Sequence, residues 1–165
     1  MIETKATVHI NASAEEIWKY VIRLDDWWLR SNPREHIELS LIDADEIKQG
    51  TRFNLKEYIA GIRGEAIAEV SQMVPLQKLV WKSIEAKYYL ICFSVNIEEG
   101  GEFELVENPD GCMLSHHVWG RIQMPLLNKI VEWFFKNMLK GEKKDYEHTY
   151  RELLFVKDEI ETRNT

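Results

Sequence analysis

The most constraining feature of this sequence is a change in the spacing of its apolar residues near residue 125. Between residues 36 and 122, apolar and polar residues alternate with a period of two, which predicts β-strands. Turn signals divide this region into strands near 37–41, 53–59, 62–73, 78–86, 101–107 and 112–122. The sequence Asn108-Pro109-Asp110-Gly111 is typical of a hairpin turn. Six consecutive strands with short connections predict an antiparallel meander, and the first of them has an apolar face of Ile37, Leu39 and Leu41.

After Pro125 the apolar spacing becomes helical. We expect one long helix over about 126–160, with Gly141 as a weak point where a kink could form. Its predicted inward stripe consists of Leu127, Ile130, Val131, Phe134, Met138, Tyr146, Tyr150, Leu153 and Val156. One face of the predicted sheet must be covered, and this helix is the longest element that can cover it.

The first thirty residues predict a strand and two short helices. Residues 2–11 alternate as a half-buried strand would. Ser13, with Glu16 three residues later, forms a capping box that begins a helix over 14–23. A second helical piece is expected from Asp25 to Arg30, before Asn32-Pro33. The complete order, with about seven strands, predicts a single α+β domain over residues 1–165.

Composition limits the function classes. Lys and Arg number 21 against 28 Asp and Glu, a net charge of −7, so no nucleic-acid partner is expected. Cys92 and Cys112 have no disulfide or zinc spacing, and we expect two free, mostly buried thiols in a reducing compartment. No signal-peptide pattern and no membrane-spanning run is present in the sequence, so the expected location is cytoplasmic.

Three segments carry a family resemblance. The run from Thr7 to Trp18 is similar to the opening strand and helix start of START-like (SRPBCC) proteins, which include polyketide cyclase/dehydrase-like and lipid-transfer domains. The run from Phe103 to His117 resembles a hairpin of the same superfamily, and the C-terminal helix ending in Tyr150-Arg151-Glu152-Leu153 also matches. The resemblance implies a helix-grip fold: a curved antiparallel sheet around a long C-terminal helix, with a deep cavity between them. The region 43–50 lacks the glycine-rich loop of the plant-allergen branch, so a phosphate-binding loop is not expected.

The implied cavity and the many aromatic residues favour binding of an apolar or amphipathic small molecule, such as a lipid. Small residues at Gly64, Ala66 and Ala68 should leave room inside the sheet. The expected ligand-binding residues are Trp28, Phe53, Leu55, Ala66, Ala68, Trp81, Phe103, Leu105, Leu114, His116, Val118, Phe134 and Met138. Few inward charges are expected, so we expect a cavity that is almost wholly apolar.

Two titratable residues are candidates for acid–base chemistry. Strand alternation directs His116 inward and His117 outward, and Glu57 shares the inward face of Phe53 and Leu55. Each has a simpler reading: His116 as a buried, hydrogen-bonded residue, and Glu57 at a wet or bulged strand end. No catalytic or metal-binding motif occurs. The residues His9, His36 and His148 are too scattered in the sequence to predict a metal site, so no metal or cofactor is expected.

The adjacent Trp27 and Trp28 point about 100° apart on a helix, so one of them is expected to stay partly exposed. With the apolar run 88–93 they could form a gate over the cavity, or simply pack at the sheet edge. Three functions remain open: small-molecule binding, a cyclase/dehydratase-like enzyme using His116 and Glu57, and an interaction protein using exposed aromatic residues. A homodimer is also possible.

Overall fold

The structure, a computed structural model, describes residues 2–90, 93–123 and 141–163. A seven-stranded antiparallel sheet has the strand order β1-β7-β6-β5-β4-β3-β2. Its strands are β1 (Ile2–Ile10), β2 (His36–Ile42), β3 (Arg52–Ile59), β4 (Ile62–Val74), β5 (Lys78–Tyr89), β6 (Ser94–Asn108) and β7 (Gly111–Ile122). The helices are α1 (Ala14–Val21), α2 (Leu24–Ser31) and α4 (Gly141–Arg163).

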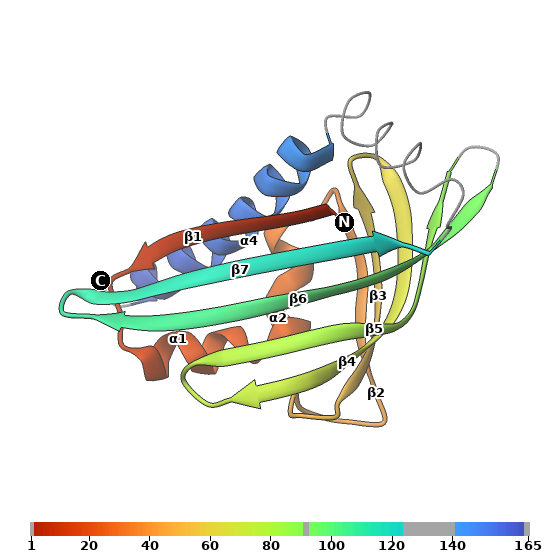
Figure 1. Cartoon of the computed structure of the whole chain (residues 1–165). Coiled ribbons are helices and arrows are strands. Elements are labelled where there is room, and N and C mark those ends of the chain that lie inside the picture. The colour runs from red at the N-terminus through yellow and green to blue at the C-terminus, as the bar shows by residue number, and fades with distance from the viewer. Residues whose placement is uncertain (1, 91–92, 124–140, 164–165) are drawn as a thin grey trace.

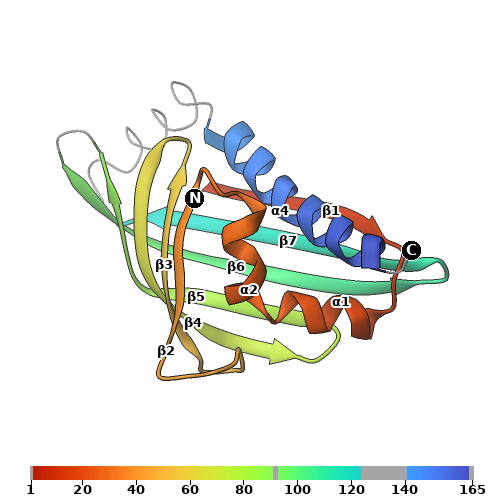
Figure 2. The same ribbon diagram turned by 180° about the vertical axis from the view of Figure 1, so that it is seen from behind.

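The sheet curves around the helices, which all lie on its concave side (Figure 1). Seen from behind, α4 runs along β1 and β7, while α1 and α2 lie across the middle of the sheet (Figure 2). This arrangement confirms the predicted α+β class, with two short helices after the first strand and a long C-terminal helix.

The predicted helix cap and hairpin turn are both present in the structure. The Ser13 hydroxyl accepts a hydrogen bond from the backbone N–H of Glu16, and the Glu16 carboxylate accepts one from the backbone N–H of Ser13. The β6–β7 turn closes between Asn108 and Gly111, and Gly111 has a φ of 135° that favours glycine. Cys112 is a buried free thiol, as expected, whereas Cys92 lies outside the described residues.

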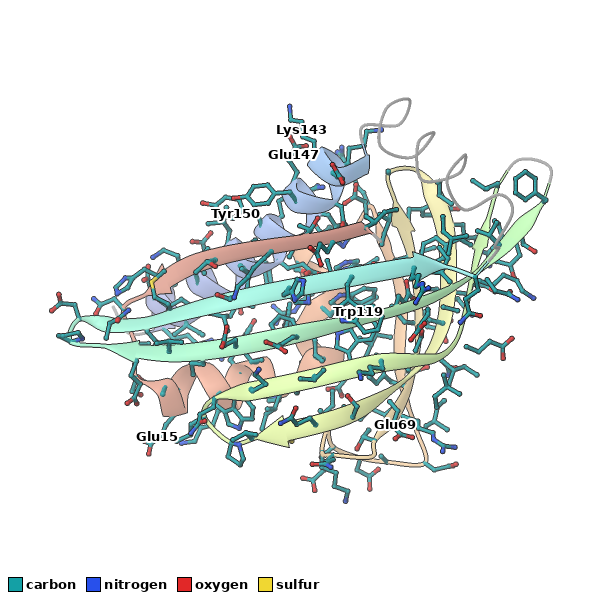
Figure 3. All side chains as sticks on the ribbon, in the orientation of Figure 1. Glu15, Glu69, Trp119, Lys143, Glu147 and Tyr150 are labelled. Atoms are coloured by element: carbon teal, nitrogen blue, oxygen red, sulfur yellow. The ribbon has the colours of Figure 1, made fainter. Side chains whose placement is uncertain are left out.

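The helical stripe was predicted only in part. Leu153 and Val156 are fully buried, but Tyr146 is 45% exposed and Tyr150 is partly exposed. Figure 3 shows Lys143, Glu147 and Tyr150 pointing away from the sheet. The buried face of α4 instead carries Asp145, His148, Thr149 and Glu152, so apolar spacing alone gave the wrong face for this half of the helix. The predicted residues Leu127, Ile130, Val131, Phe134 and Met138 lie outside the described residues.

A bulge changes the beginning of β2. The pairing of β2 with β3 shifts register between His36 and Glu38. As a result, His36 and Leu39 are both buried, whereas Ile37 is 47% exposed. Simple alternation had placed Ile37 on the inward face, and this is wrong because a bulge inserts one extra residue and rotates those before it.

The core lies between the concave face and the three helices. Its largest fully buried apolar side chains include Ile10, Ile17, Trp27, Phe103, Leu114 and Leu153. None of the helices within the described ranges combines the length and apolar character needed to cross a membrane.

Candidate functional site

A pocket of about 140 Å³ lies on the concave side of the sheet, against the first half of α4. Aromatic and aliphatic side chains form much of its wall, among them Phe53, Trp81 and Phe103. The wall is not wholly apolar, which corrects the prediction. It also carries Glu57, Glu99, His116, Asp145, His148, Thr149 and Glu152.

The predicted ligand-binding residues fall into three groups. On the pocket wall are Trp28, Phe53, Leu55, Trp81, Phe103, His116 and Val118. Buried in the sheet but absent from that wall are Ala66, Ala68, Leu105 and Leu114. Phe134 and Met138 lie outside the described residues.

The small residue Gly64 of β4 does not leave the space that was expected. A Cβ atom built on Gly64 would lie 2.7 Å from the ring of Tyr88, so that ring fills the space beside the glycine. Gly101 similarly accommodates the indole of Trp81, 2.5 Å from a built Cβ. These glycines therefore allow two aromatic side chains to lie flat against the sheet.

Five titratable side chains meet at the polar side of the pocket: His36, Glu57, His116, His148 and Glu152. The Nε2 atoms of His36 and His148 are 2.9 Å apart. Glu57 Oε2 lies 3.9 Å from the first of these atoms and 3.6 Å from the second. Glu152 Oε1 lies 3.2 Å from His36 Nε2, while Glu152 Oε2 bonds His116 Nδ1 at 2.9 Å. We call these five residues the polar cluster.

Four elements bring the polar cluster together, with His116 coming from β7. The β2–β3 register places His36 opposite Glu57, and the bulge in β2 turns His36 inward. Helix α4 supplies His148 and Glu152, which are one helical turn apart and share its buried face. His36 is fixed further by stacking on Trp28, with ring centroids 3.4 Å apart.

Glu152 is the central anion of the polar cluster. Burial alone would raise the pKa of its carboxyl, but hydrogen bonds and charge from His116, His148 and His36 hold that pKa well below its ordinary value. The indole N–H of Trp28 also donates to Glu152, at 2.9 Å. A buried carboxylate with these partners stays ionised.

The pKa of His148 is shifted in the opposite direction to that of Glu152. Burial disfavours its charged form, but Glu152, Glu57 and Glu35 outweigh burial and raise its pKa to about 10. Its Nδ1 lies 2.8 Å from the Glu35 carboxylate, which Arg151 also contacts at 2.8 Å. His148 and Glu152 therefore form a buried charge pair.

Three carboxyls on the pocket wall hold protons more tightly than usual. Burial raises the pKa of Glu57 to about 8, against the opposing charge of His148. Burial also raises the pKa of Glu99 to about 7, although a 2.7 Å hydrogen bond from the Tyr88 hydroxyl lowers it. The pKa of Asp145 is raised as well, mainly by burial. Glu57 is thus inward and buried, as predicted, rather than at a wet strand end.

His116 also points inward, as predicted, and it is both hydrogen-bonded and turned to the pocket. Its ring stacks on Phe103 with centroids 3.9 Å apart. Its Nε2 is buried and lacks a hydrogen-bond partner among the described residues, as does Glu99 Oε1. Both residues contribute to the pocket wall.

Both tryptophans of α2 are buried, so the prediction that one of the two rings stays partly exposed is wrong. Trp27 is 0% exposed and stacks on Tyr20, while Trp28 is 5% exposed and lies against His36. Both can be buried because α2 has the sheet on one side and α4 on another (Figure 2). Neither ring therefore provides an exposed docking surface. Tyr88 and Leu90 line the pocket, while residues 91–92 of the proposed gate lie outside the described residues.

Five residues of this site were not predicted from the sequence: His36, Glu99, Asp145, His148 and Glu152. Although His9, His36 and His148 are far apart in the sequence, His36 and His148 are in contact, and His9 lies apart from them and exposed. One signal was present: Asp145, His148 and Glu152 have helical spacing and share a face. No comparable signal marked His36, because the bulge alone directs it inward.

The sequence matches no family profile and no curated protein, but the fold matches solved structures. A protein from Thermus thermophilus aligns with a TM-score of 0.70 and 13% identity, covering 99% of both chains. A START superfamily protein from Mycobacterium smegmatis aligns at 0.67 and 19% identity, over 97% of this chain and 99% of that one. The di-domain ARO/CYC protein StfQ, from the steffimycin biosynthetic pathway, aligns at 0.65 and 13% identity, over 99% of this chain and 52% of its own. With its sheet curved around a long C-terminal helix, the chain has the START-like, helix-grip fold.

Proposed function

We propose that this protein binds a small amphipathic molecule that carries a hydrogen-bond donor. The observation that supports this most directly is the pair of unpaired buried atoms, His116 Nε2 and Glu99 Oε1, in residues of a mainly apolar pocket wall. A buried polar atom without a partner costs free energy, which a ligand can recover by supplying one. Few but well-placed polar groups give such pockets their specificity.

The chemistry of the two atoms defines the ligand's polar group. His116 Nδ1 faces the ionised Glu152 carboxylate and so carries a proton. In the neutral ring, Nε2 is then an acceptor. Glu99 Oε2 already accepts from Tyr88, and the ionised form of Glu99 leaves Oε1 as a second acceptor. A hydroxyl group of a ligand, with one O–H, can donate to one of these two atoms, and an amino group can donate to either. A pocket of about 140 Å³ suits a single aromatic ring, since a cavity of about 150 Å³ can hold benzene.

The test compares cresol with xylene, in which a methyl group of similar size replaces the hydroxyl. The wild-type protein should bind cresol at least about tenfold more tightly, equivalent to about 1.4 kcal/mol. The variants His116→Phe, which keeps the stacking on Phe103, and Glu99→Gln should each reduce this preference. His117→Phe, on the neighbouring outward-facing residue, should keep it. The proposal fails if wild-type protein binds neither compound, or if the preference is the same in all four proteins.

A second candidate function is acid–base catalysis of the cyclase or dehydratase kind, with His116 and Glu57 as the acting groups. The supporting observation is that Glu152 orients His116, a residue of the pocket wall, through Nδ1 and leaves its Nε2 without a hydrogen-bond partner among the described residues. This is how a carboxylate orients a general base. An ARO/CYC protein among the structural neighbours agrees with it.

Catalysis can be tested without the natural substrate. A general base at His116 should speed the exchange of α-hydrogens of an indanone for deuterium, followed by NMR in D₂O. The rate should fall to the buffer rate in His116→Phe but not in His117→Phe. An equal rate with and without wild-type protein would leave binding as the function.

A further inference from the structure

Three donor atoms of the polar cluster converge from three elements. They are Nε2 of His36 on β2, Nε2 of His148 on α4 and Oε2 of Glu57 on β3. Their separations are 2.9, 3.6 and 3.9 Å. All three residues are buried, and Glu57 and His148 also line the pocket.

The opposite edges of the two rings determine what these nitrogens can do. His36 Nδ1 lies 2.6 Å from the backbone carbonyl of Trp28, which can only accept, so Nδ1 carries the proton. His148 Nδ1 lies 2.8 Å from the carboxylate of Glu35 and donates to it in the same way. In the charged form of His148, its Nε2–H lies between the two Nε2 atoms, which are 2.9 Å apart; once that proton is lost, both neutral rings present lone pairs to each other. Such a contact is stable only if a cation, either a proton or a metal ion, lies between them.

The surroundings match those of metal-binding histidines, which usually donate their second ring N–H to a carboxylate or a backbone carbonyl. His36 has the carbonyl and His148 has the carboxylate. Both partners are themselves held: Arg151 contacts Glu35, and Trp28 stacks on His36. These contacts fix the direction of both lone pairs.

We propose that His36, Glu57 and His148 bind a divalent transition-metal ion. With metal–ligand bonds of about 2.0–2.2 Å, tetrahedral ligand atoms lie about 3.4 Å apart, and the three observed separations are distributed about that value. Two imidazoles and one carboxylate suit zinc, iron or cobalt, whereas magnesium and calcium prefer all-oxygen sites. Three protein ligands leave a coordination position free, and Glu57 and His148 place the site at the pocket wall.

Glu152 is a supporting residue in this site. Its Oε1 is 3.6 Å from His148 Nε2, but it already accepts the Trp28 indole N–H, and its Oε2 bonds His116. Glu152 and, beyond His148, Glu35 place negative charge near the proposed ion. A divalent cation would also favour the ionised form of the buried Glu57 carboxyl.

The experiment uses untagged protein treated with a chelator and then dialysed. Isothermal titration with Zn²⁺ should show one site per chain, and Co²⁺ should give the intense visible absorption of a tetrahedral site. Mg²⁺ should not bind. Zn²⁺ should also raise the melting temperature in a concentration-dependent way.

Variants locate the site. Glu57→Gln, which preserves shape, should weaken Zn²⁺ binding at least tenfold, and His36→Gln or His148→Gln should abolish it. His9→Gln, an exposed histidine on β1, is the matched control and should bind normally. Circular dichroism checks that each variant is folded. Failure of wild-type protein to bind Zn²⁺ and Co²⁺ would overturn the proposal and assign the 2.9 Å contact to a shared proton. Binding that is equal in wild type and Glu57→Gln would also overturn it, since the ion would then lie elsewhere.

Discussion

The two halves of α4 bury opposite kinds of side chain. The first half contributes His148 and Glu152 to the polar cluster, next to the pocket. The second half contributes Leu153, Val156 and Ile160 to the apolar core, against α1 and the sheet. The change occurs between neighbours: Glu152 is 2% exposed and Leu153 is 0% exposed. Next to the pocket, the buried side chains of α4 are polar, and beyond the pocket they are apolar.

The physical difference between the halves lies in how each side chain is satisfied. Leu153 is stabilised by removal of apolar surface from water, which is non-directional. Glu152 is tolerated only because Trp28 and His116 donate hydrogen bonds to it. Substitutions in the first half of α4 should therefore change the free energy of unfolding through lost charge interactions, and this change should depend on pH. Substitutions in the second half should change it through lost side-chain volume.

The largest effect is expected from Glu152→Gln. Loss of one partner of a buried ionic cluster leaves the other charge uncompensated, so the free energy of unfolding should fall by about 3–5 kcal/mol. Urea unfolding in chelator-containing buffer measures this. The control Glu147→Gln changes an exposed residue one turn away on α4, paired with Lys143, and should cost less than about 1 kcal/mol. Equal losses in the two variants would contradict the central role of Glu152.

The apolar half should respond to volume alone. Leu153→Ala should lower the free energy of unfolding by about 3 kcal/mol, because it removes buried methyl groups and leaves a cavity. This loss should be the same at pH 5 and pH 8. A loss that varies with pH would mean that the two halves are not independent.

On the polar side of the pocket, Glu99 should make the free energy of unfolding depend on pH. Its folded pKa of about 7 exceeds the ordinary value of 4.5, so the folded state binds the proton more tightly. Stability from this group is therefore present below pH 4.5 and lost as pH rises through 7. Glu99→Gln removes this titration and keeps an acceptor for the Tyr88 hydroxyl. Between pH 4.5 and pH 8, the free energy of unfolding of this variant should therefore rise relative to that of wild type by up to about 3 kcal/mol. The exposed Glu98→Gln should show no such gain.

The smallest effect is expected where the pocket wall meets β6. A methyl group in Gly101→Ala would lie 2.5 Å from the Trp81 indole and displace it. We expect a loss of about 1–3 kcal/mol, typical of overpacking, together with a changed Trp fluorescence spectrum. Gly50→Ala is a useful contrast, because a built Cβ there meets nothing within 4 Å and only its φ of 88° opposes the change. An unchanged spectrum in Gly101→Ala would mean that the Trp81 ring does not lie against this glycine.

Much of the fold could be predicted from the sequence, because local chemistry fixes it. The capping box at Ser13, the turn before Gly111 and the alternation of β7 each depend on residues close together in the chain. The inward directions of His116 and Glu57 followed from the period of a strand, which geometry sets without further information.

The tertiary structure alone decided the site. His36 turns inward through a bulge that no residue pattern announced, and it meets His148, 112 positions later, only because α4 packs across the sheet. Trp27 and Trp28 are both buried because separate elements cover separate faces of α2. The buried face of α4 is polar near the pocket because residues distant in the sequence form hydrogen bonds and ion pairs with it. The spacing of apolar residues along the helix does not indicate such partners. The sequence therefore determined which elements form and which way most strands face, while long-range packing determined which charged groups meet.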